Sequence, residues 1–197
     1  LTNITAQLSL FLAYGAPLGF MVWLPIRLHA ASPAFRRSGV HLAIWIGAFG
    51  GWLLARCYLE FLLAFHGVPF GRPDPVFGKD LGFYIYWLPV LKESFFALEA
   101  ALLVSIGFTL AARADALHAE GVLDDPAVPA GRKAGLFAVP YLNFLLYGLG
   151  AVAVAHTWLG RYGLLLKENE PSGVRLGAGY LDLVGLFSHL NNVYVKV

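Results

Sequence analysis

The chain has 197 residues, of which 58% are apolar and only 13% are charged, and its formal net charge is +2. Soluble domains carry about 25% charged residues, so this composition argues against a water-soluble globular protein. The small net charge and the lack of a long Lys/Arg run give no basis for a nucleic-acid partner, and we expect none. The single cysteine, Cys57, excludes an internal disulfide.

Long apolar blocks predict about four transmembrane helices, because some 20 apolar residues cross a hydrocarbon core of ~30 Å. We place these spans at residues 8–26, 40–65, 89–112 and 134–160. The second span is longer than a membrane is thick, so it should tilt or project. We therefore expect an all-α integral membrane protein with a single membrane domain, residues 1–197.

Two further segments carry a different pattern. Residues 67–88, GVPFGRPDPVFGKDLGFYIYWL, are too rich in Pro, Gly and charge for a spanning helix and too aromatic for an ordinary solvated loop. We expect an ordered interfacial or re-entrant segment there. The tail, residues 161–197, is partly apolar but too short and too polar for a fifth span, which favours an interfacial helix.

The positive charges do not fix the orientation in the membrane. If the N-terminus lies outside, the inner loops carry Arg27, Arg36, Arg37, Arg113, Arg132 and Lys133. The outer segments then carry Arg72, Lys79, Lys92, Arg161, Lys167, Arg175 and Lys196. The two sets are too similar in size to decide.

Short motifs recur along the chain in a fixed order. The interfacial segment holds FG, DP, FGKD and FY, which place the motif residues at Phe70, Gly71, Asp74, Pro75, Phe77, Gly78, Asp80, Phe83 and Tyr84. A WLxRY element follows at residues 158–162 and a GAxYxD element at 177–182. In this order and spacing they resemble uncharacterised protein family 0182, whose members are large bacterial multi-span membrane proteins.

The resemblance covers the membrane-span portion of that family, without its large soluble region. Gly160 and Leu181 depart from the family pattern, which usually has an acidic and a hydroxyl residue there. The resemblance implies a further span upstream, which would put the first residue, the interfacial segment and the tail on the outer face. The family has no established activity, so the resemblance implies an architecture and leaves the function open.

The acidic residues of the interfacial segment allow two interpretations. Asp74 and Asp80, with Arg72 and Lys79 nearby, could bind a cation or a lipid headgroup, because two carboxylates supply hard oxygen ligands. Alternatively, Asp74 caps a turn before Pro75, and Asp80 caps the next short helix. We favour the capping interpretation.

Four polar residues are expected within or at the edge of the membrane, namely Arg56, Glu60, Glu99 and Asn143. Ionisable groups are costly in hydrocarbon and often mark an ion or proton path. Arg56 and Glu60 lie four residues apart, so they could instead neutralise one another, while Glu99 faces another helix. We favour this structural interpretation, because a proton relay usually needs more than one deep carboxylate.

Small residues offer two helix-packing sites. Gly47 and Gly51 form a GxxxG pair, and Ala151 and Ala155 form a second small-residue pair in the last span. Both pairs would let another helix approach closely.

The sequence shows no metal-binding or catalytic signature. Its six histidines lack metal-ligand spacing, and GxSxG, P-loop and CxxC motifs are missing. His41 and His156 lie near span ends and could ligate a pigment metal axially, although an interfacial role is commoner. We expect no enzymatic activity, no metal site and no intrinsic cofactor, with bound lipids and contact with a pigment as the remaining possibilities.

These observations favour a non-enzymatic accessory or structural subunit in the bacterial inner membrane. Its partners would be membrane lipids and the transmembrane subunits of a larger complex, with a photosynthetic reaction centre–antenna complex as one hypothesis. The alternative is a transporter or channel fragment that uses Glu99, Arg56 and Glu60. A membrane enzyme is a weaker third hypothesis.

Overall fold

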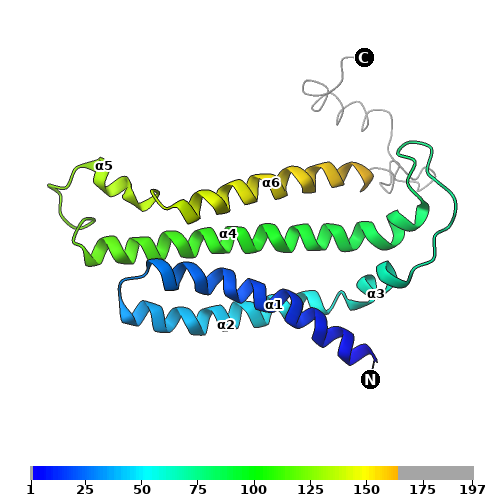
Figure 1. The fold of residues 1–197 in the computed structure, drawn as a ribbon, viewed down its shortest axis with the longest axis horizontal. Helices are drawn as coiled ribbons and strands as arrows, with labels where there is room; N and C mark the ends of the chain where they lie inside the picture. Colours follow the sequence, from blue (N-terminus) through cyan, green and yellow to red (C-terminus); the bar gives the residue numbers. More distant parts are fainter. Residues whose placement is uncertain (1, 164–197) are drawn as a thin grey trace, which may run out of the picture.

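The computed structural model describes residues 2–163, and four of their helices are long and apolar enough to cross a membrane (Figure 1). The long helices are α1 (Thr2–His29), α2 (Pro33–Ala55), α4 (Leu88–Ala119) and α6 (Pro140–Gly163). Shorter elements are α3 (Tyr58–His66), a π-helical turn (Phe83–Trp87), α5 (Ala130–Lys133) and a 3-10 turn (Ala134–Leu136). Residues 2–163 contain no strand, so the predicted all-α fold class is confirmed. The expected interfacial tail lies almost wholly outside the described residues.

The four long helices lie side by side in the order α2, α1, α4, α6; α1 and α4 run parallel to each other, and α2 and α6 run antiparallel to them (Figure 1). One end of the bundle holds the α1–α2 turn and the connection 120–139. The opposite end holds the start of α1, the helix α3, residues 67–82 and the last turn of α6. Each helix keeps a wide apolar face exposed, as expected for helices that contact lipid.

Three of the predicted boundaries differ from the structure. The span expected at 40–65 is two helices, because the backbone tightens at Arg56 and Cys57, whose N–H groups bond the carbonyls of Leu53 and Leu54. The span expected at 134–160 begins only at Pro140, which lacks an N–H and so suits the start of a helix. Residues 83–88, expected in the interfacial segment, are helical and lead directly into α4.

The backbones of helices α1 and α2 are in direct contact at their glycines. A Cβ added to Gly47 would lie 2.6 Å from the carbonyl oxygen of Gly15, and one added to Gly51 would lie 2.5 Å from that of Phe11. The packing role predicted for Gly47 and Gly51 is therefore confirmed, and their partners are Gly15 and Gly19 on α1. Such close approach strengthens van der Waals contact, the main attraction between helices in lipid.

A buried hydroxyl joins α4 to α1. Pro25 has no N–H, so the carbonyl of Met21, four residues earlier, loses its helical partner. The hydroxyl of Ser105, which is fully buried, donates to this oxygen at 2.7 Å. The hydroxyl of Thr109, which is also fully buried, donates a hydrogen bond to the Ser105 carbonyl of the same helix at 2.7 Å. These two buried hydroxyls are thus satisfied without water.

A carboxylate on α4 holds the α1–α2 turn. Asp115 accepts hydrogen bonds from the N–H groups of Ala31 and Ser32, at 2.9 and 2.8 Å, and from the Ser32 hydroxyl at 2.8 Å. Ser32 is also the N-cap of α2, where its oxygen accepts from the Phe35 N–H. One side chain therefore joins the end of α1 and the start of α2 to the last turns of α4.

Replacing Gly47 by Ala should destabilise the protein by about 1–3 kcal/mol, because the new methyl group must push α1 and α2 apart. Gly150→Ala on α6 is the matched control, since nothing lies within 4 Å of its added Cβ. Reversible unfolding in mixed micelles would measure both variants. Equal stabilities for the two would contradict the proposed backbone contact.

Candidate functional site

Residues 67–82 form an ordered loop, called here the hairpin, at one end of the bundle (Figure 1). Its two arms pair at Pro73 and Asp80, with backbone hydrogen bonds from Asp74 N to Lys79 O and from Leu81 N to Arg72 O. Gly71 and Gly78 have φ angles of +66° and +65°, a region that a Cβ disfavours. The turn geometry therefore explains both glycines of the motif.

Asp74 organises the tip of the hairpin. It is 7% exposed, and its oxygens accept from the N–H groups of Val76, Phe77 and Lys79 and from the hydroxyl of Tyr84, at 2.6–3.0 Å. Burial alone would raise the pKa of Asp74, but these hydrogen bonds outweigh it and hold the pKa below its usual value.

Asp80 organises the base of the hairpin in the same way. Its carboxylate accepts from the N–H groups of Gly82, Phe70 and Arg72, at 2.7, 3.0 and 3.2 Å. The Gly82 N–H in particular holds the pKa of Asp80 below its usual value. The predicted capping role of both aspartates is thus confirmed. Their oxygens are already engaged, and no cluster of potential metal ligands occurs among residues 2–163.

The hairpin docks on the last turn of α6 through an aromatic cluster, defined here as Phe77, Phe83, Tyr84, Trp158 and Tyr162. The ring of Tyr162 lies 5.0 Å from that of Phe77 and 5.1 Å from that of Phe83, both edge to face. Tyr84, Leu88, Leu159 and Tyr162 are all buried there.

Arg161 covers this aromatic cluster. Its guanidinium lies 3.9 Å from the Trp158 ring centre and donates to the Tyr162 hydroxyl at 2.6 Å. The FGKD and WLxRY motifs, about 80 residues apart in the chain, therefore form one structural unit. Sequence reasoning found both motifs but not their contact.

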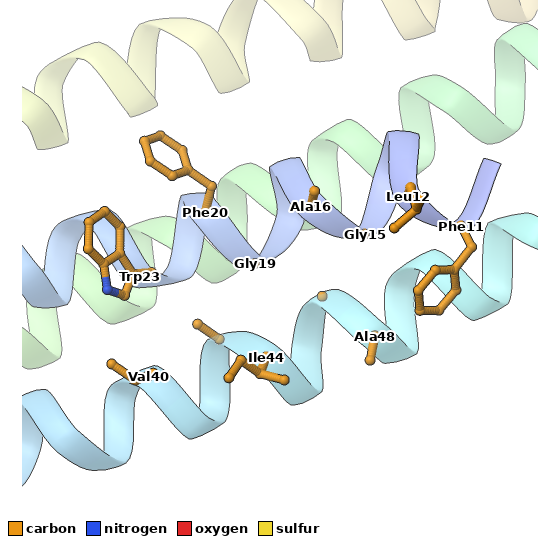
Figure 2. Close-up of a pocket in the computed structure, with 12 residues that line it drawn as sticks. Phe11, Leu12, Gly15, Ala16, Gly19, Phe20, Trp23, Val40, Ile44 and Ala48 are labelled. Carbon is orange, nitrogen blue, oxygen red and sulfur yellow. The ribbon is translucent and has the colours of Figure 1, made fainter. Parts of the chain in front are cut away.

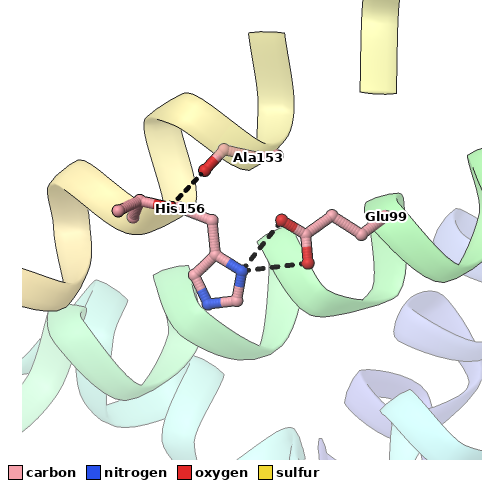
Figure 3. Close-up of polar contacts among 4 residues, drawn as sticks. Glu99, Ala153 and His156 are labelled. Carbon is pink, nitrogen blue, oxygen red and sulfur yellow. Dashed lines mark hydrogen bonds and ion pairs between the residues drawn. The ribbon is translucent and has the colours of Figure 1, made fainter. Parts of the chain in front are cut away.

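A second polar site lies between α4 and α6. The Nδ1 atom of His156 is 3.0 Å from both carboxylate oxygens of Glu99, and the two side chains face each other between the helices (Figure 3). Both are partly buried, and the His156 ring stacks on Phe95. With Glu99 ionised, its carboxylate can only accept, and Nδ1 would then carry the proton; Nε2 has no partner among the described residues. The expectation that Glu99 faces another helix is confirmed.

The other predicted polar residues lie apart from this pair. Arg56 does not pair with Glu60 among the described residues: it ends α2 and stacks over Trp52 at 5.2 Å, while Glu60 is exposed at the start of α3. The break between the two helices explains why that predicted pair is wrong. Asn143 is exposed on the first turn of α6, and His41 is exposed on α2.

Comparison with known sequences identifies the family. The profile of an uncharacterised protein family, UPF0182, matches residues 25–194, which include both halves of the aromatic cluster. This chain belongs to UPF0182. No solved structure is significantly similar to it.

Curated UPF0182 proteins from several bacteria resemble this chain. The protein of Corynebacterium efficiens is 31% identical over 208 residues, covering 92% of this chain and 20% of its own length. That of Cupriavidus necator is 34% identical, covering 75% of this chain and 15% of its own length. That of Synechococcus sp. is 33% identical, covering 72% and 16%. The chain thus spans about a fifth or less of these UPF0182 relatives, and matches their membrane-span portion.

Acid should loosen the hairpin. The stabilisation from Asp74 is complete above the usual carboxyl pKa of 3.8 and is lost as the pH falls through the lower pKa of the folded state. We expect hydrogen–deuterium exchange of residues 67–84, corrected for the intrinsic rate, to accelerate between about pH 5 and about pH 2. Asp74→Asn should weaken protection already at pH 5, while peptides from the middle of α6 serve as a control. Unchanged hairpin protection at the acidic limit would count against this role.

Proposed function

We propose that this chain forms a non-enzymatic structural unit that packs against the helices of a larger complex in the bacterial inner membrane. The main support for this proposal is the exposed outer face of α6. In the most apolar part of this helix only 17% of residues are buried, the lowest share among the four spans. Among residues 2–163 the helix packs mainly against α4, and the hairpin covers its last turn.

The exposed side of α6 has the spacing of a helix-packing surface. Phe144, Tyr147, Ala151, Val154 and Trp158 are all exposed, and they follow one another at intervals of three and four residues. Side chains at this spacing form one stripe along a helix. Ala151, predicted as a packing residue together with the half-buried Ala155, lies in the middle of that stripe. A neighbouring helix could therefore approach most closely at Ala151.

The described polar groups support a structural role. The carboxylates of Asp74, Asp80 and Asp115 are occupied by backbone N–H groups, and Glu99 is engaged by His156. Such groups hold elements together and are not free to act on a substrate. This argument extends to the complete UPF0182 protein only as a proposal, because the chain matches a small part of its relatives.

Removing the stripe should release the partner subunits. We expect Tyr147→Ala with Val154→Ala to abolish stoichiometric co-purification in mild detergent, whereas Trp45→Ala with Phe49→Ala, which trims a comparably exposed face of α2, should preserve it. A visible absorption band in the purified complex would identify a pigment-binding assembly such as a photosynthetic reaction centre with its antenna. A wild-type protein that runs as a monomer without partners would contradict the structural role.

The Glu99–His156 pair favours a second candidate, proton-coupled transport. A carboxylate and an imidazole in contact within the membrane could exchange a proton with a third group, and the free Nε2 of His156 gives that group an approach. In liposomes, Glu99→Gln should then abolish flux while leaving the fold intact. Under the structural proposal no flux is observed, and Glu99→Gln leaves co-purification unchanged. The pair of measurements separates the two functions.

A further inference from the structure

The seam between α1 and α2 is hollowed on the side that faces away from α4. A groove of about 470 Å³ runs along it, with Phe11 at one end and Trp23 at the other (Figure 2). Its floor consists of small residues, among them Gly15, Gly19 and Gly47, which bring the two helices close together. Because these residues lack long side chains, the groove stays open along the seam.

The shape of the groove fits one elongated apolar group. Twelve residues of helix separate Phe11 from Trp23, which corresponds to about 18 Å of helix axis. This length is close to one leaflet of the hydrocarbon core, roughly 15 Å. The walls are aromatic or aliphatic side chains, including Phe20 and Ile44. Nothing in the lining offers a charged partner, so the centre of the groove suits a hydrocarbon chain.

The Trp23 end of the groove opens onto three arginines. A second cavity of about 390 Å³ shares Trp23 with the groove and is lined by Arg27, Arg36 and Arg37. All three arginines are exposed, and none lies within 4.0 Å of a carboxylate of residues 2–163. Arg36 donates through Nε to the Ala30 carbonyl, which fixes its position and leaves its two terminal nitrogens without a hydrogen-bond partner among residues 2–163.

Asp115 is close enough to Arg36 for electrostatic attraction, but the two side chains form no ion pair within 4.0 Å. The carboxylate oxygens of Asp115 accept hydrogen bonds from the N–H groups of Ala31 and Ser32 and from the Ser32 hydroxyl. The opposite end of the seam differs, because its cavity is lined by one cation, Arg56, which stacks over Trp52. Positive charge is therefore concentrated at one end only, where guanidinium groups could bind phosphate oxygens in pairs.

We propose that the α1–α2 seam binds one anionic phospholipid, with its phosphate on Arg27, Arg36 and Arg37 and an acyl chain in the groove between Trp23 and Phe11. The apolar groove would hold the acyl chain, and the arginine cavity one helical turn beyond Trp23 would hold the headgroup. This site is independent of the α6 stripe and of the Glu99–His156 pair, so it does not rest on the proposed function.

Native mass spectrometry of the detergent-solubilised protein tests the headgroup site with dioleoyl phosphatidylglycerol and dioleoyl phosphatidylcholine. The wild type should bind the anionic lipid preferentially. Arg27→Gln with Arg37→Gln should weaken that binding about 25-fold, since two cations are removed and each cation near an anionic surface contributes roughly a factor of five. Arg132→Gln with Lys133→Gln, on α5 at the same end of the bundle, is the matched control and should leave binding unchanged (Figure 1). An equal loss in the control, or no loss in either pair, would overturn the site.

A second measurement tests the acyl chain and needs no groove-filling variant. The fluorescence of Trp23 is obtained as the difference between the wild type and Trp23→Phe. Brominated phosphatidylglycerol at a low mole fraction should quench it more strongly than brominated phosphatidylcholine does. Trp45 is the control, because it is 73% exposed and does not line the groove. Its fluorescence, obtained in the same way from Trp45→Phe, should be quenched equally by both lipids. Equal quenching at Trp23 would place the chain outside the groove. Cross-linking of two copies through Ala16 after substitution by Cys would instead show a second protein copy there and would refute the lipid.

Discussion

Every backbone N–H and C=O within a bilayer must find a partner inside the protein, and this constraint explains several irregular points of the fold. Where Pro25 leaves the Met21 carbonyl without its helical partner, the Ser105 hydroxyl donates a hydrogen bond to it. Where α1 gives way to α2, Asp115 accepts the N–H groups of the turn. Where the chain re-enters the bundle ahead of Pro89, the π-helical turn supplies a bond from Leu88 N–H to Phe83 O.

The same rule explains the hairpin. Only a short bridge at Pro73 and Asp80 pairs its backbone, so most of its N–H groups lack helix or sheet partners. Asp74 and Asp80 accept them instead, each through several short bonds. Tyr84 then links the Asp74 carboxylate to the buried cluster around Tyr162, so the loop gains a fixed place on α6.

Hydropathy was sufficient to predict the spans, because apolar blocks of this length have few alternatives. Capping was also predictable, since Asp before a turn has a local cause. The break at Arg56 was missed because α2 and α3 form one apolar run. The contact between Phe77 and Tyr162 was missed because nothing local encodes it. The Glu99–His156 pair was within reach: both residues lie at a similar depth, counted from the connection that α4 and α6 share.

The pairing of Glu99 with His156 also bears on how the chain enters the membrane. Glu99 is synthesised 57 residues ahead of its partner, so α4 first reaches the translocon with an unaccompanied acid. The charge is costly in lipid until α6 arrives. We therefore expect α4 and α6 to enter the lipid together as a helix pair, because His156 on the later helix is the partner of Glu99 on the earlier one.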